Sequence, residues 1–180
     1  MKRKLISRRG LTLPELLVSL ALMSLLAAGV STGISAAAAA QRDSVALSEA
    51  SLLLDSVTKA VIGELRYATE VNDPSAAGAV TPPTGYTEVY TSGVDYISAV
   101  YGLDTRFYTA TDPAGMPRIF VEAGGDDYPI LGEGAYSDLG AEIVSLTYES
   151  ATKSFLVELA ITLPGGARQE YPEFRIYPVF

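Results

Sequence analysis

A long apolar run near the N-terminus dominates the hydrophobic pattern of this chain. Residues 16–34 contain no charged side chain, and the small residues 36–40 extend the run. A bilayer core of about 30 Å is crossed by roughly 20 helical residues, so the run predicts a membrane-spanning helix. Two other interpretations fit the same residues. One is a secretory signal peptide cut near residues 38–40, and the other is a plain single-pass anchor.

The helical pattern continues beyond the apolar run. Residues 42–70 contain no proline and a single glycine, Gly63. Apolar residues at spacings of three, four and seven form one stripe, which comprises Leu47, Leu54, Val57, Val61, Leu65 and Ala68. We therefore expect an amphipathic continuation of the helix over residues 41–72, ended by Asn72, Asp73 and Pro74.

After residue 73 the apolar residues alternate as they do in strands. This period predicts strands at residues 86–90, 94–101, 106–110, 117–123, 143–148, 154–163 and 169–180. The clearest is 154–163, where every second residue from Phe155 to Leu163 is apolar. One antiparallel sheet with an apolar face needs a cover, and the helix stripe can provide it. The expected fold class is α+β: a long N-terminal α-helix, half embedded in the membrane, packed on an antiparallel β-sheet head over residues 73–180.

Charge is distributed unevenly along the chain. Residues 1–10 hold five of the 13 basic residues and none of the 21 acidic ones. The remainder is strongly acidic and has no general attraction for nucleic acid phosphates, so no nucleic-acid partner is expected. The positive-inside rule places the basic residues on the cytoplasmic side of the membrane and the head outside.

The residue types needed for most catalytic sites are missing. The chain has no His and no Cys, which removes the commonest general base, the commonest metal ligand and all thiolate chemistry. We expect no catalytic residue, no cofactor and no enzymatic activity. The one candidate metal site is a Gly-rich loop with four carboxylates, namely Asp126, Asp127, Glu133 and Asp138. Their oxygens suit calcium but their spacing does not match an EF-hand, so a solvated acidic loop is the alternative.

A more specific pattern precedes the apolar run. Arg8, Arg9 and Gly10 are followed by Leu11-Thr12-Leu13-Pro14-Glu15. This segment resembles the N-terminus of type IV prepilins, in which a membrane aspartyl peptidase cuts after the glycine and methylates the new N-terminal amine. The resemblance implies that residues 1–10 are a leader removed by cleavage between Gly10 and Leu11, and that Leu11 is then methylated. Glu15 becomes the fifth residue of the mature chain, the characteristic acidic position of the family.

Three residues of the predicted membrane helix carry hypotheses about assembly. A carboxylate at the edge of a hydrocarbon layer costs a few kcal/mol unless it is paired. We hypothesise that Glu15 pairs with the amine that cleavage creates on Leu11 of its own or a neighbouring chain; the alternative is a carboxylate that stabilises the helix start. Gly29 and Gly33 form a small-xxx-small pair that permits close helix packing, although glycine is also common in membrane helices.

The resemblance implies a structural subunit of a type IV pilus-like filament. Many major pilins have a C-terminal cysteine pair that this chain lacks, which favours a minor pilin or a pseudopilin. The implied partners are the prepilin peptidase, other pilin or pseudopilin subunits and the membrane. The implied locations are the cytoplasmic membrane, with residues 11–40 as the transmembrane and filament-core helix, and then a cell-surface or extracellular filament. The alternative function is a secreted or membrane-anchored β-rich binding module with an ordinary signal segment.

Overall fold

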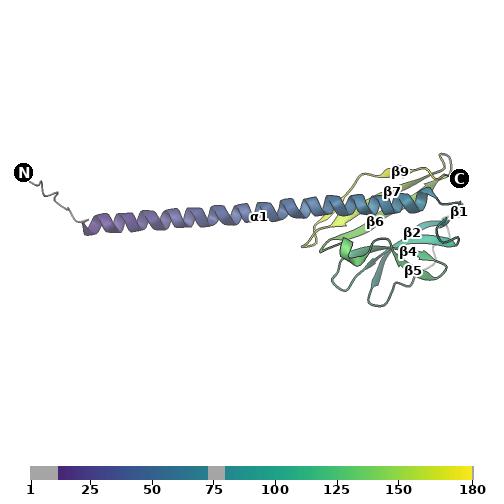
Figure 1. The fold of residues 1–180 in the computed structure, drawn as a ribbon, viewed down its shortest axis with the longest axis horizontal. Helices are drawn as coiled ribbons and strands as arrows, with labels where there is room; N and C mark the ends of the chain where they lie inside the picture. The colour runs from purple at the N-terminus through teal and green to yellow at the C-terminus, as the bar shows by residue number, and fades with distance from the viewer. Residues whose placement is uncertain (1–11, 73–79, 180) are drawn as a thin grey trace, which may run out of the picture. The chain divides into compact units, whose positions relative to one another are not determined.

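The computed structural model describes residues 12–72 and 80–179 (Figure 1). It divides into two compact units, Met1–Val45 and Ala46–Phe180. Helix α1 (Leu13–Arg66) contributes to both, and every strand lies in the second unit. The fold therefore combines one long N-terminal apolar helix with antiparallel β-sheets, which confirms the predicted α+β class.

In the first unit the chain is helical from Leu13 onward, and all of residues 12–45 are exposed. Pro14 lies in the first turn, where its missing N–H removes no helical hydrogen bond. By length and composition α1 is able to cross a membrane. An apolar helix with no buried residue along this stretch needs lipid or other helices around it.

In the second unit α1 buries one stripe of side chains, comprising Ala50, Leu53, Val57, Val61 and Leu65. The predicted stripe is confirmed at Val57, Val61 and Leu65, and also at Ala68, which is buried just beyond the helix. It is wrong at Leu47, which is 50 % exposed. The strands cover the helix only from Ala50 onward, and helical periodicity does not reveal where such a cover begins.

The helix also ends earlier than predicted. It stops at Arg66, and Glu70–Asn72 forms strand β1 instead of a last helical turn. β1 pairs antiparallel with the end of β2 (Thr87–Ile97), and the Thr69 N–H donates to the Ile97 carbonyl at 2.9 Å. The early end of the helix has a long-range cause. A strand distant in sequence offers residues 70–72 the hydrogen bonds that the helix would otherwise supply.

The head contains two sheets, where one was predicted. The first sheet has the order β1-β2-β3-β4-β5 and includes β3 (Asp104–Thr111), β4 (Pro117–Ala123) and β5 (Asp126–Pro129). The two strands predicted at 86–90 and 94–101 are one strand, β2, whose pairing with β3 contains two register shifts. β5 lies in a segment predicted to lack strand structure, because its polar sequence carries no apolar alternation.

The second sheet is built around β7 (Ser154–Thr162). β7 pairs with β6 (Gly140–Glu149), so the strands predicted at 143–148 and 154–163 form an antiparallel hairpin. It also pairs with the short strands β8 (Arg168–Glu170) and β9 (Phe174–Ile176). The predicted strand over residues 169–180 is therefore two strands. Pro172 lies between them, as expected for a residue that cannot donate a ladder hydrogen bond.

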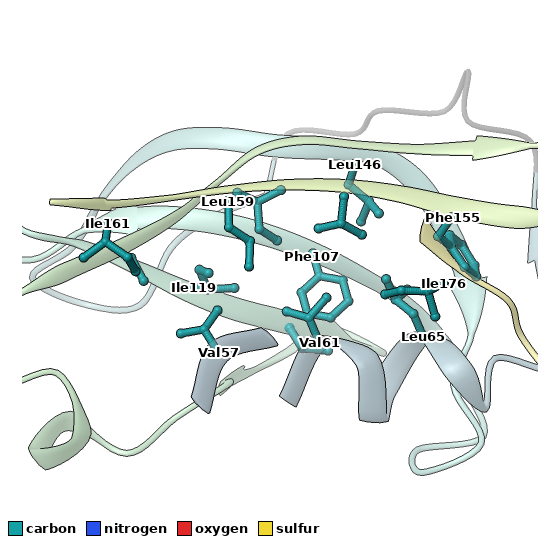
Figure 2. Close-up of a cluster of buried hydrophobic side chains, with 14 of the residues drawn as sticks. Val57, Val61, Leu65, Phe107, Ile119, Leu146, Phe155, Leu159, Ile161 and Ile176 are labelled. Atoms are coloured by element: carbon teal, nitrogen blue, oxygen red, sulfur yellow. The ribbon is translucent and has the colours of Figure 1, made fainter. Parts of the chain in front are cut away.

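Both sheets and the helix contribute to one core (Figure 2). Val57, Val61 and Leu65 of the helix meet side chains of both sheets, and Phe155, Val157, Leu159 and Ile161 of β7 are buried as their alternation predicts. β3 is buried on both faces. A second small cluster on its other face comprises Val80, Tyr108, Ala110 and Phe120, with Tyr86 packed against them.

Candidate functional site

The predicted site residues fall into three groups. Gly10 and Leu11, the predicted cleavage and methylation positions, lie outside the described residues. Glu15, Gly29 and Gly33 lie on α1 in the first unit. The four carboxylates of the predicted acidic loop lie in the second unit, so the structure places the assembly candidates and the metal candidates on separate parts of the chain.

Glu15 lies in the first turn of α1. The Leu16 N–H donates to the Thr12 carbonyl at 3.1 Å, so helical hydrogen bonding starts at Thr12. Thr12 and Glu15 then have the spacing of a capping box, and a carboxylate at this position also interacts favourably with the unpaired N–H groups of the helix start. Within residues 12–72 and 80–179, Glu15 forms no ion pair. Its carboxylate thus remains available for a charge from outside that range.

Four hydroxyl groups of the apolar helix have hydrogen-bond partners within the helix itself. Ser19 donates to the Glu15 carbonyl at 2.8 Å, Ser24 to Ala21 at 2.8 Å, Thr32 to Gly29 at 2.9 Å and Ser35 to Ser31 at 2.6 Å. An unpaired hydroxyl in an apolar medium costs several kcal/mol. Because these groups are satisfied locally, the helix can be buried in lipid or among other helices without that cost.

Large apolar side chains surround this part of the helix. Leu16, Leu17, Leu22 and Met23 are each more than half exposed. Removal of one such side chain from water is favourable by roughly 1.5–3 kcal/mol. The exposed surface is far larger than the apolar patch of an ordinary soluble protein, which marks it as a surface that is covered when the protein functions.

Gly29 and Gly33 lie one turn apart on the exposed helix. A methyl group added at either position would meet no atom within 4 Å. Nothing within the chain therefore requires glycine there. The small side chains leave room for a second helix to approach closely, as in other small-xxx-small pairs.

The four carboxylates of the predicted acidic loop belong to different elements of the head. Asp126 and Asp127 belong to β5, Glu133 to the short 3-10 helix η1 (Glu133–Ala135), and Asp138 to the segment that follows. Within the described part of the chain, no three acidic side chains are grouped as metal ligands. Asp127 instead accepts a hydrogen bond of 2.8 Å from the Tyr108 hydroxyl.

Sequence reasoning missed an ion-pair network in the head. Arg118 on β4 pairs with Asp112 at 2.8 Å, donates to the Leu139 carbonyl and lies over the ring of Tyr136. Asp112 also accepts the N–H groups of Ala114 and Met116, both at 2.9 Å. The signal in the sequence was a charged residue between Pro117 and Ile119, at the start of an otherwise apolar strand. The network joins the β3–β4 turn to the segment around η1.

Comparison with protein families identifies one match. Residues 6–31 match the prokaryotic N-terminal methylation motif, the type IV prepilin-like signature. The matched segment includes Glu15 and Gly29 as well as the predicted cleavage position, and it confirms the resemblance found at residues 8–15. Comparison with curated proteins and with solved structures gives no match for the chain. The motif and the apolar helix together support a type IV pilin-like precursor, which is a structural class of protein.

Proposed function

We propose that this chain, which carries the type IV prepilin-like signature, is a minor pilin or pseudopilin of a type IV pilus-like filament. The observation that carries the proposal is the coincidence of the methylation motif at residues 6–31 with a helix that exposes apolar side chains throughout residues 13–40. The motif implies processing, and the exposed helix requires a membrane before assembly and other helices after it.

The proposed maturation begins at the membrane. Residues 1–10 stay on the cytoplasmic side because of their basic residues, while residues 11–40 span the bilayer and the head lies outside. The prepilin peptidase cuts between Gly10 and Leu11 and methylates the new amine of Leu11. The mature chain then leaves the bilayer for a cell-surface filament, in which residues 11–40 form the core and the rest of α1, up to Arg66, carries the head.

Glu15 and the glycine pair have separate roles in this proposal. The Glu15 carboxylate pairs with the amine of Leu11, its own or that of a neighbouring subunit, as the helix leaves the lipid. Both charges would be costly alone in an apolar environment, so each favours the arrangement in which they meet. Gly29 and Gly33 allow the helices of adjoining subunits to approach closely.

The test is the N-terminus of the mature protein in the producing cell. Intact mass and N-terminal sequencing are expected to show a chain that begins at methylated Leu11. Gly10→Val should leave the precursor uncut and keep it out of filaments, whereas Gly63→Ala, a change on the helix outside the motif, should be processed normally. A mature chain that begins near Gln41 would overturn the proposal in favour of a secreted binding module with an ordinary signal peptide.

A further inference from the structure

A cleft of about 270 Å³ lies between the end of α1 and β9, within the second unit. Its walls are Ile62 and Arg66 of the helix and Arg175, Ile176 and Tyr177 of the C-terminal segment. The Val179 N–H donates to the Arg66 carbonyl at 2.8 Å, which holds this segment against the last helical turn. We refer to this feature as the Arg66 cleft.

Arg66 differs from the other arginines of the second unit. Four of them form ion pairs with carboxylates of the chain: Arg106, Arg118, Arg168 and Arg175. The guanidinium of Arg175 bonds Glu149 at 2.8 Å and Thr152 at 3.0 Å, so its charge is compensated within the head. Across the two described stretches, Arg66 has no ion pair, although the chain contains 21 acidic residues. An exposed cation at the helix end is favourable in itself, but that does not account for the cleft beside it.

Three exposed apolar or aromatic residues belong to the two segments that form the Arg66 cleft. Tyr67 is 55 % exposed, Tyr177 is 60 % exposed and Val179 is 65 % exposed. Tyr177 is part of the cleft wall, and Tyr67 follows Arg66 in sequence. Val179 is held against Arg66 by its backbone hydrogen bond. Tyrosine and arginine are the residue types that dominate binding energy in protein interfaces. Exposed apolar residues on ordinary surfaces are usually scattered singly, whereas here several lie on neighbouring segments.

We infer that the Arg66 cleft receives a carboxylate side chain of an adjoining filament subunit, with Tyr67, Tyr177 and Val179 packing around it. The inference rests on the proposed function. A guanidinium binds a carboxylate through two parallel hydrogen bonds. Beside Arg66, the cleft is lined by Ile62, Ile176, Tyr177 and the already paired Arg175. A helical filament needs a contact between two different surfaces of successive subunits. Exposed carboxylates such as Glu133 and Asp138, away from the cleft, show that a chain of this kind can present the complementary surface.

The experiment places a photoreactive phenylalanine analogue at Tyr177 of the full-length chain in filament-producing cells. Illumination is expected to join it to a subunit carrying the same N-terminal motif, at a peptide that contains Asp or Glu. The cross-link should be lost in Arg66→Gln and partly retained in Arg66→Lys. Arg168→Gln is the matched control, since Arg168 on β8 is also exposed but is paired with Glu142 of β6 and Glu170 of β8. That control should leave the cross-link unchanged.

The outcomes separate this inference from the proposed function. If the wild-type chain enters filaments but gives no cross-link, or a cross-link that Arg66→Gln does not change, the docking site is wrong and the filament role stands. If Arg66→Gln instead lowers the melting temperature of the head without a cross-link in the wild type, Arg66 serves its own chain, for example the C-terminal carboxylate, and the inference fails. If the wild-type chain is neither processed nor found in filaments, the proposed function itself is wrong.

Discussion

The guanidinium of Arg118 lies over the ring of Tyr136, 4.4 Å from its centroid. Arg118 lies on β4, and Tyr136 is the residue that follows η1. Arg118 also pairs with Asp112 in the β3–β4 turn. Both side chains of the Arg118–Asp112 pair are only 12 % exposed. This contact therefore joins the start of β4 and the β3–β4 turn to the segment around η1.

Replacing Arg118 should destabilise the head. Arg118→Ala leaves the Asp112 carboxylate and the Leu139 carbonyl without their partner and removes the cation from the Tyr136 ring. We expect a loss of about 2–4 kcal/mol in the free energy of unfolding, measured by denaturant titration of the full chain in detergent. Lys59→Ala removes a fully solvated i,i+4 pair and should change little. Equal effects of the two changes would show that the network does not stabilise the head.

Two leucines on α1 provide a matched test of the core. Leu65 is fully buried, whereas Leu52 on the same helix is 66 % exposed. Leu65→Ala should cost about 2–5 kcal/mol because it leaves a cavity against both sheets. Leu52→Ala should change the free energy of unfolding by no more than about 0.5 kcal/mol. The same denaturant titration compares the two, and a similar cost for both would contradict the burial pattern of the helix.

Stability in alkaline solution should depend on Tyr136. Burial raises the pKa of Tyr136 from its ordinary value of 10.0 to about 12. The folded state holds this proton more tightly than the unfolded chain, so the stabilisation is complete below about pH 10 and is lost as the pH rises toward about 12. The bound proton of Tyr136 contributes on the order of 2 kcal/mol to the free energy of unfolding.

The pH test compares Tyr136→Phe with the wild type. The variant should show a shallower fall in unfolding free energy between pH 10 and 12, because one buried titrating group is gone. Leu52→Ala, which removes an exposed side chain without a titrating group, should keep the wild-type slope. If the slope of Tyr136→Phe equals that of the wild type, the buried hydroxyl does not govern alkaline unfolding.

Glutamine at position 15 distinguishes the two roles considered for Glu15. A capping box accepts Glu or Gln, whereas pairing with the Leu11 amine needs a charged carboxylate. We expect both Glu15→Gln and Glu15→Ala to be processed and inserted in the membrane, and both to be lost from the sheared filament fraction. Normal incorporation of Glu15→Gln would instead assign Glu15 to helix capping alone.

Substitutions at Gly29 and Gly33 test the predicted helix packing. Alanine keeps the surface nearly flat and favours the helix by about 1 kcal/mol at each site. A Cβ at either position meets no atom within 4 Å in the isolated chain, but the longer side chain of leucine would hold a second helix away. We expect the double alanine variant to assemble and the double leucine variant to remain in the membrane fraction. Assembly of the leucine variant would exclude close packing at this pair.

The sequence by itself determined the features that depend on neighbouring residues. The apolar run, the position of Glu15 relative to Gly10 and the alternation from Phe155 to Ile161 are all local patterns. A membrane segment and a leader are recognised by local chemistry, so residues 6–31 were enough to indicate the class of protein. The β6–β7 hairpin was equally predictable, since its two strands are joined by a short turn.

Only the tertiary structure decided the features that depend on distant partners. α1 ends at Arg66 because β1 finds hydrogen bonds on β2, and the polar strand β5 exists because β4 offers it an edge. The division into two sheets, the Arg118 contacts and the Arg66 cleft each join segments far apart in the chain. The periodicity of a sequence shows which face of an element is apolar. It does not show which other element covers that face or forms hydrogen bonds with its edge.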